Sequence, residues 1–466
     1  MGVAVSNWRL ARAVSLTGQL GVVSGTALAL VQTRLLQRGD PGGNLRRAFD
    51  HFPLPAIAER VWRDYFVSGG ILAGAPFKGV PMPALRPSAA FLELTVLANF
   101  AEVWLAKENH AGRIGINFLE KIQLPTLPSL YGAMLAGVDF VLMGAGIPRA
   151  IPGALDQLAR GEAAELKIDI AGALPEDDCF NRFDPRSIFP DGPPALARPQ
   201  FLAIVSSATL AMTLAKKSNG RVDGFVVEGA LAGGHNAPPR GPLQLSATGE
   251  PVYGPRDAAD LPKIRELGLP FWLAGAFSRP GKIAEARTHG ATGVQVGTAF
   301  AFCEESGIIP DLKRRVRELI RAGTAHVYTD PFASPTGFPF KVVQLAHTLS
   351  DAVTYAARER LCDLGYLRQL FRRPDGTVGY RCPGEPAADF LRKGGTEAEL
   401  AGRKCLCNGL AATVGLAQTR TSGELEPAIV TAGDELTQLA DYFDFTRDSY
   451  SAADVVRILL GARATV

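Results

Sequence analysis

The sequence predicts an α/β fold made of repeated βα units. Short apolar runs rich in β-branched residues recur up to about residue 300, and segments with a helical pattern separate most of them. The runs are almost continuously hydrophobic, as expected for parallel strands that are buried on both faces. Strands that alternate with helices form either a closed (β/α)8 barrel or an open doubly wound sheet.

The predicted strands share this apolar character and are followed by turn or helix signals. They cover residues 20–24, 113–117, 138–143, 201–205, 224–228, 271–274 and 293–296. Helices are predicted over residues 203–217, 257–267 and 278–289. Ser278 and Pro280 suggest an N-cap and an early helical proline for the last of these.

Two segments do not follow the repeat and are predicted to be insertions on the loop face. They lie at about residues 39–90 and 174–199, and residues 167–170 could add a small hairpin strand there. The pattern changes again near residue 321. We therefore predict a barrel domain over residues 1–325 and a smaller, mostly helical, cysteine-containing lobe over residues 326–466.

Composition excludes several classes of protein. Hydrophobic residues make up 47% of the 466 residues and charged residues 20%, which is too apolar for a disordered chain. The net charge is only +3 and no basic stripe stands out, so no nucleic-acid partner is expected. No uninterrupted apolar run is long enough to span a membrane, and no signal peptide is recognisable, so we expect a cytoplasmic protein.

A glycine-rich turn with a histidine follows the predicted strand 224–228. The run 229–240 contains Gly233, Gly234 and His235, which would lie at the carboxyl end of the strand. Barrel enzymes place their chemistry at that end, and an imidazole can act there as acid, base or hydrogen-bond donor. A turn histidine bonded to nearby carbonyls would explain His235 taken alone.

The next two strands also end in glycine. Gly275 follows strand 271–274, and Gly297 with Thr298 follows strand 293–296. Backbone N–H groups after two consecutive late strands can cradle a phosphate group. The joint pattern therefore predicts a phosphate or flavin ligand on a βα fold.

With these residues in place, the sequence resembles the nitronate monooxygenase superfamily, formerly called 2-nitropropane dioxygenases. That group also includes flavin-dependent enoyl-ACP reductases and the trans-acting enoyl reductase of polyunsaturated fatty acid synthases. The resemblance covers about residues 1–300 and implies a TIM barrel that binds FMN. It also implies His235 as the catalytic residue. The cofactor-binding residues it implies are Ser24, Gly25, Asn117, Glu228, Gly233, Gly234, Gly275, Gln295, Val296, Gly297 and Thr298.

The sequence departs from the family pattern at three places. Glu228 stands where nitronate monooxygenases tend to have glutamine, and a Glu-Gly pair there is more typical of the bacterial enoyl reductases. Leu231 replaces a frequent acidic residue. Met1 and Gly2 begin the chain where the family normally has a first strand before a Met-Gly turn, so we expect either a truncated start or a barrel without its first strand.

The resemblance implies two enzymatic functions. The preferred one is oxidation of alkyl nitronates with O2; the alternative is reduction of an enoyl thioester, such as an enoyl-ACP, with NAD(P)H. The partners would be a small-molecule substrate and, for the alternative, an acyl carrier protein. A non-catalytic flavin carrier within a biosynthetic complex is a third hypothesis, which a complete site with a base argues against.

The C-terminal lobe offers two further candidates. Cys362, Cys382, Cys405 and Cys407 could bind zinc or an iron–sulfur cluster, although their spacing is unusual and buried thiols are the simpler interpretation. The stiff segment 330–341 is interpreted as a packed linker; the alternative is that it folds over the barrel mouth with Lys341 facing an anionic ligand.

Overall fold

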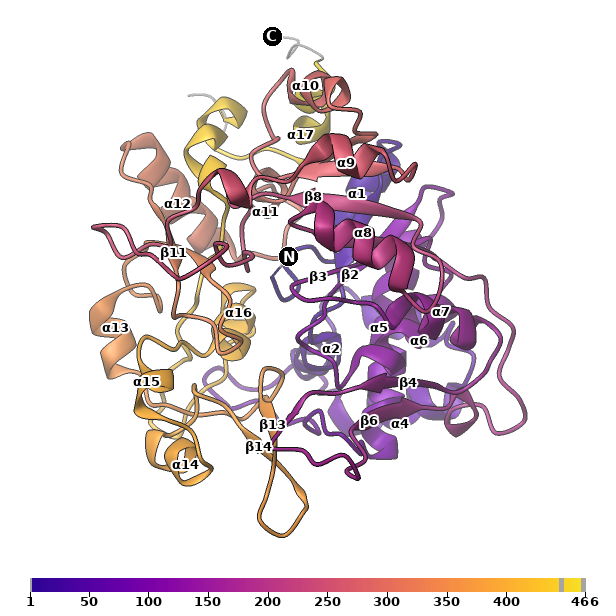
Figure 1. Ribbon diagram of the computed structural model, residues 1–466. Coiled ribbons are helices and arrows are strands. Elements are labelled where there is room, and N and C mark those ends of the chain that lie inside the picture. The colour runs from indigo at the N-terminus through magenta and orange to yellow at the C-terminus, as the bar shows by residue number, and fades with distance from the viewer. Residues whose placement is uncertain (1, 444–447, 462–466) are drawn as a thin grey trace.

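The computed structural model describes residues 2–443 and 448–461 and contains a parallel sheet of seven strands (Figure 1). All neighbouring strands pair in parallel, and they lie side by side in the order in which they occur in the chain. The strands are β1 (Gly21–Ser24), β2 (Ile114–Leu119), β3 (Phe140–Gly144), β7 (Gln200–Val205), β8 (Gly224–Glu228), β9 (Phe271–Ala274) and β10 (Gly293–Gln295).

The strand order decides between the two predicted architectures. A doubly wound sheet reverses its order at a switch point, whereas a barrel keeps neighbouring strands consecutive. The order is consecutive from β1 to β10, so the fold is TIM-barrel-like. Among the described residues β1 and β10 form the two edges of the curled sheet, and the residues before β1 contribute a hydrogen bond from the Ser24 amide to the Ser6 carbonyl.

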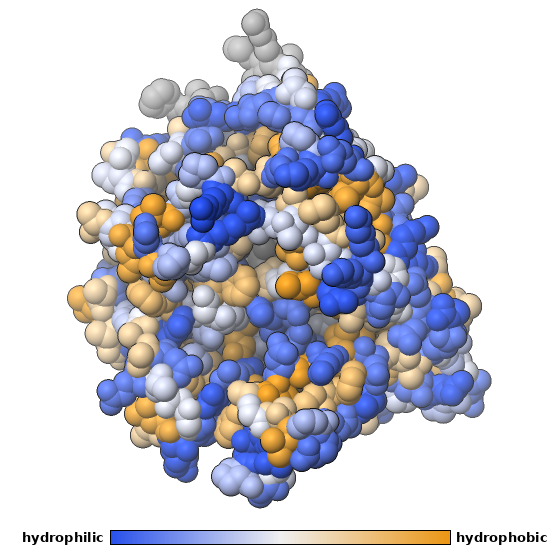
Figure 2. Space-filling model, viewed as in Figure 1, coloured by the Kyte–Doolittle hydropathy of each residue, from blue (hydrophilic) through white to orange (hydrophobic). Residues whose placement is uncertain are grey.

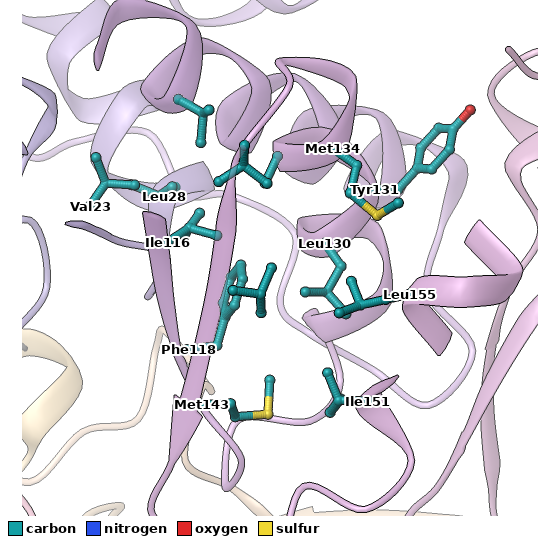
Figure 3. Close-up of a cluster of buried hydrophobic side chains, with 14 of the residues drawn as sticks. Val23, Leu28, Ile116, Phe118, Leu130, Tyr131, Met134, Met143, Ile151 and Leu155 are labelled. Atoms are coloured by element: carbon teal, nitrogen blue, oxygen red, sulfur yellow. The ribbon is translucent and has the colours of Figure 1, made fainter. Parts of the chain in front are cut away.

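Helices pack on the outer face of the sheet. Ile116 and Phe118 of β2 and Met143 of β3 meet Leu130 and Met134 of α6 (Thr126–Leu135), and all are buried (Figure 3). The alternate residues of the same strands face the other way. A second, inner cluster of buried side chains is formed by Phe140, Leu142, Leu202, Val226 and Ala274.

The remaining helices of this part of the chain lie between successive strands of the sheet, except that α11 and α12 follow the last strand, β10. They are α2 (Leu28–Gln37), α3 (Asn44–Phe49), α4 (Pro55–Tyr65), α5 (Ala89–Lys107), α7 (Ile151–Ala159), α8 (Ala208–Lys217), α9 (Leu261–Arg265), α10 (Lys282–Thr288), α11 (Thr298–Ala301) and α12 (Pro310–Arg321), with α1 (Trp8–Leu16) before β1. The predicted insertions contain α3 and α4, and short strands β4 (Ala164–Lys167), β5 (Ile170–Ala171) and β6 (Phe180–Phe183) lie beside and within the second one.

The residues after 326 form hairpins and short helices that pack back on the N-terminal part of the chain (Figure 1). Two hydrophobic clusters join the two parts of the chain. One contains Val5 and Leu436, and the other contains Leu30 and Leu410. The elements are β11 (Val327–Asp330), β12 (Phe340–Val343), α13 (Ala352–Ala357), β13 (Gln369–Arg372), β14 (Val378–Arg381), α14 (Ala387–Arg392), α15 (Glu397–Leu400), α16 (Leu406–Thr413) and α17 (Ala452–Leu459). The division near residue 326 stays a prediction.

The predicted start of α10 was wrong. The helix begins at Lys282 behind Gly281, whose φ of 84° suits glycine, and not behind Ser278. Ser278 is buried and donates through its hydroxyl to Glu435 at 2.7 Å. Because the Ser278 side chain is bonded to Glu435, which is 157 residues away, it does not cap the helix.

Helix α5 is the one described helix that is long and apolar enough to span a membrane by composition alone. It contains Glu93 and Glu102, and 72% of its most apolar window is buried inside the protein. Its contacts with α1, α2, α3, α4 and α6 account for this burial. Its apolar character is therefore explained by packing in the core.

Candidate functional site

A cavity of about 600 Å³ lies at the carboxyl ends of the parallel strands and extends into the barrel interior. Its volume is in the range of about 300–1,000 Å³ that is typical of small-molecule and cofactor sites. The space-filling view shows a hollow near the middle of the face turned to the viewer (Figure 2). The predicted site residues that line this cavity are Asn117, Glu228, Gly233, Gly234, His235, Gly275, Gln295, Val296, Gly297 and Thr298.

The Gly-Gly-His turn is held by the C-terminal part of the chain. The Gly234 amide donates to the Thr431 hydroxyl at 3.0 Å, and the Asp434 amide donates to the Leu231 carbonyl at 3.0 Å. A Cβ on Gly233 would lie 2.7 Å from the backbone of Ala432 and Gly433. Glycine is therefore needed at 233 because the two backbones approach too closely for a side chain.

His235 is fixed by contacts on two sides. Its Nε2 lies 2.7 Å from the Ser334 hydroxyl, and its ring packs edge-on against Phe340 with the centroids 4.8 Å apart. Its backbone also forms an antiparallel bridge with Phe340. Burial lowers the pKa of His235 to about 3, so the imidazole is neutral at physiological pH and is a weak base.

Glu228, at the end of β8, lines the same cavity and also a second one of about 220 Å³. His235 shares both cavities, so these two side chains stand between them. Arg240, Tyr253 and Asp257 line the second cavity. Burial raises the pKa of Glu228 to about 7, so a fraction of this carboxyl carries a proton near neutral pH.

The raised pKa of Glu228 predicts a specific pH dependence of stability. Because the folded state binds this proton more tightly than the unfolded state, the wild-type protein should lose stability as the pH rises from about 4.5 to about 7. Glu228→Gln should abolish that part of the loss, on the order of 2 kcal/mol. Urea unfolding of both proteins at pH 5 and pH 8 measures the difference. The same pH dependence in both would contradict a raised pKa.

Gly275 and Gly297 line the other side of the cavity. Gly275 has a φ of 94°, which suits glycine, and Gly297 has an ordinary φ of −115°. A Cβ on Gly297 would meet no atom within 4 Å, so this backbone borders open space. Helix α11 begins at Thr298 with Gly297 as its N-cap, and the first N–H groups of a helix lack intrahelical acceptors. This part of the cavity can therefore accept an anionic group.

Ser24 and Gly25 do not line the large cavity. Ser24 is buried and its amide donates to the Ser6 carbonyl, and a Cβ on Gly25 would lie 2.2 Å from the Phe118 ring. Gly25 borders a separate small cavity of about 20 Å³. The structure thus brings together all the other predicted site residues and leaves these two outside.

Lys341 does not face the cavity. It is buried, and its ammonium donates to Asp434 at 2.6 Å and to Thr329 at 2.8 Å. The segment 330–341 does reach the site, but through Ser334 and Phe340. These contacts of Lys341 fit the interpretation of the segment 330–341 as a packed linker.

The late cysteines lie near one another in the C-terminal part of the chain. Cys382 donates to Cys362 and lowers its pKa, while Cys407 is raised in pKa by burial and then by nearby Cys405 and Cys362. Within residues 2–443 and 448–461, no group of three or more potential ligands could hold a metal ion. Of the four, Cys407 borders the large cavity.

Several residues of the site could not be found from their own sequence context. Ser334 contacts a histidine 99 residues away, and Thr431 holds a glycine 197 residues away. Trp272 and Glu435 also line the cavity. The hydroxyl groups between prolines in the segment 330–341 are the one local signal that could have indicated Ser334.

Comparisons with known proteins find matches to the part of the chain that contains this site. Residues 196–327, which include β7 to β10 and the Gly-Gly-His turn, match the family described as Nitronate monooxygenase. A curated relative, a probable nitronate monooxygenase from Bacillus subtilis (strain 168), is 34% identical over 122 residues. The match covers 26% of this chain and 33% of the relative, so it spans about a third of the relative's length.

Similar solved structures cover nearly the whole chain at low identity. FabK from Thermotoga maritima is 14% identical with a TM-score of 0.46, covering 99% of this chain and 90% of its own. A nitroalkane oxidase from Streptomyces ansochromogenes is 18% identical with a TM-score of 0.42, covering 99% and 93%. The enoyl reductase domain of MlnA from Bacillus amyloliquefaciens is 11% identical with a TM-score of 0.43, covering 99% and 92%.

Proposed function

We propose that the protein, whose residues 196–327 match the Nitronate monooxygenase family model, is an FMN-dependent oxidoreductase that oxidises alkyl nitronates with O2. One observation carries the proposal. His235, Gly275 and Gly297 line a single cavity at the carboxyl ends of parallel strands, where barrel enzymes hold their ligands.

The residues of this cavity fit a phosphorylated flavin. The open space at Gly297 lets the backbone approach a phosphate closely, and Gly275 lines the same side of the cavity. Gly233 and Gly234 would border the ring, with Asn117 from β2 as a polar neighbour. A bound flavin would supply redox chemistry that these side chains lack, by taking electrons from an organic substrate and passing them to O2.

His235 would then orient the substrate beside the ring. A neutral imidazole offers one N–H donor, which suits a negatively charged nitronate oxygen. Its low pKa makes it a poor base for removing a proton from carbon. We therefore expect preformed nitronates to be better substrates than neutral nitroalkanes.

The second candidate is an enoyl-thioester reductase that uses NAD(P)H. One observation favours it: Glu228 retains a proton near neutral pH and stands between two adjoining cavities, which could hold two different ligands. A carboxyl group that is partly protonated at pH 7 can give a proton to a reduced substrate.

Absorption spectroscopy of the purified protein tests both candidates. We expect a flavin spectrum after reconstitution with FMN, rapid anaerobic bleaching by a preformed alkyl nitronate, and oxygen consumption when air is admitted. Bleaching by NADPH but not by nitronates would reject nitronate oxidation in favour of the enoyl-thioester reductase. If FMN does not bind at all, both candidates fail and a role without flavin is required.

A further inference from the structure

We propose that Ser334 is a positioning residue: its hydroxyl donates to Nε2 of His235 and so fixes the imidazole in the form that carries its proton on Nδ1. The catalytic consequence of this tautomer rests on the proposed function, but the tautomer itself does not. The inference stands on hydrogen-bond geometry in the segment between β11 and β12.

The ring of His235 has little freedom to choose another partner. Nε2 lies 2.7 Å from Ser334 Oγ, and Ser334 is fully buried. Phe340 packs edge-on against the same ring and pairs with the His235 backbone. Within the described residues Nδ1 has no protein partner, so it is the nitrogen left for a ligand in the two cavities that His235 borders.

The surroundings of Ser334 are compatible with a hydroxyl that donates to the imidazole. Ser334 Oγ accepts from the Thr336 amide at 3.2 Å and lies 2.8 Å from the Thr336 hydroxyl. If Thr336 donates both hydrogens to Ser334, the hydroxyl hydrogen of Ser334 is free to point at Nε2, and the Nδ1–H of His235 is left as a donor for a ligand in the cavities. In the opposite direction, the hydroxyl hydrogen of Thr336 would have no partner among the described residues.

A serine and a histidine 2.7 Å apart also resemble the nucleophile and base of a hydrolase. Ser334, however, is fully buried and does not border the large cavity or its neighbour. No acyl group can reach its oxygen. The pair is therefore suited to orienting the imidazole and not to attacking a substrate.

The consequence is that the protein enforces the tautomer that free imidazole side chains favour less in water, where the Nε2-protonated form predominates. An Nδ1–H group held toward the cavity is a fixed donor for an anionic oxygen, and donors held in place before the reaction cost no reorganisation during it. Thr336, which is half-buried, would hold the Ser334 hydroxyl in the required direction by donating to its oxygen.

Nitrogen-15 NMR of the whole protein with labelled histidine tests the tautomer directly, with the His235 signals assigned by their loss in His235→Phe. We expect Nδ1 to be protonated in the wild type, and the Nε2-protonated form to become the major one in Ser334→Ala. Thr336→Val, at a half-buried position, should shift the ratio in the same direction and serves if Ser334→Ala folds poorly. Ser350→Ala is the matched control, because Ser350 forms a similar 2.8 Å pair with Thr348 away from His235 and should leave the signals unchanged.

Two results would overturn the proposal: an Nε2-protonated His235 in the wild type, or the same tautomer in the wild type, Ser334→Ala and Thr336→Val. If flavin and nitronate assays succeed, Ser334→Ala should also lower kcat about tenfold with little change in KM, because orientation and not binding is lost. If those assays fail in the wild type while the NMR result holds, the proposed function is wrong and the positioning role stands.

Discussion

Replacement of His235 by phenylalanine is expected to lower turnover of a preformed nitronate by about 10²–10³-fold, the usual cost of losing one fixed hydrogen-bond donor. The phenyl ring keeps the packing against Phe340 but offers no N–H to the substrate. It also leaves the buried Ser334 hydroxyl without its acceptor, which should cost about 1–3 kcal/mol of stability. Steady-state oxygen consumption and thermal unfolding measure the two effects.

His235→Asn is the informative companion variant. The amide nitrogen of asparagine can take the place of Nδ1 as a donor, so this variant should recover a measurable part of the turnover. FMN affinity should change little in either variant. Equal activity of the phenylalanine variant and the wild type would show that His235 does not contact the substrate.

Gly297→Val is expected to lower FMN affinity by at least about 10²-fold while the protein stays folded. A Cβ at this position meets no protein atom within 4 Å and the φ of −115° suits any residue, so we expect a change in unfolding free energy within about 1 kcal/mol. The added side chain would occupy the space where the phosphate is proposed to bind. Flavin fluorescence titration measures the affinity and urea unfolding the stability.

Gly79→Val is the matched control, because Gly79 also has open space around its Cβ position but lies outside the described cavities. It should bind FMN like the wild type. Normal FMN affinity in Gly297→Val would place the phosphate elsewhere and remove the main support for the flavin proposal.

The parallel strands could be predicted because strands buried on both faces are continuous apolar runs in the sequence. Strands 224–228 and 271–274 were predicted with the bounds that the structure has, since each is a continuous apolar run that ends at a charged or glycine residue. The glycine and histidine residues after β8, β9 and β10 followed directly, because parallel strands bring their carboxyl ends to one edge.

Contacts between distant segments were not predictable in the same way. The start of α10 was misplaced because Glu435, 157 residues away, uses the Ser278 hydroxyl. Ser24 is the last residue of β1, which was predicted over 20–24 and spans 21–24, yet it is buried and its amide donates to the Ser6 carbonyl before α1. Ser334 and Thr431 contact the site only after the C-terminal part of the chain has packed against the barrel. The hydrophobic pattern of the sequence does not indicate which distant segments will make contact.

The clamp of Thr431 and Asp434 on the Gly-Gly-His turn has a consequence for how the protein is made. When the barrel strands have been translated, Thr431 and Asp434 have not yet been synthesised, because they lie about 200 residues after the turn that they hold. The nascent barrel therefore emerges with its histidine unanchored. Competence for chemistry is acquired only near the end of translation, so a chain interrupted before residue 430 should accumulate as an inert species.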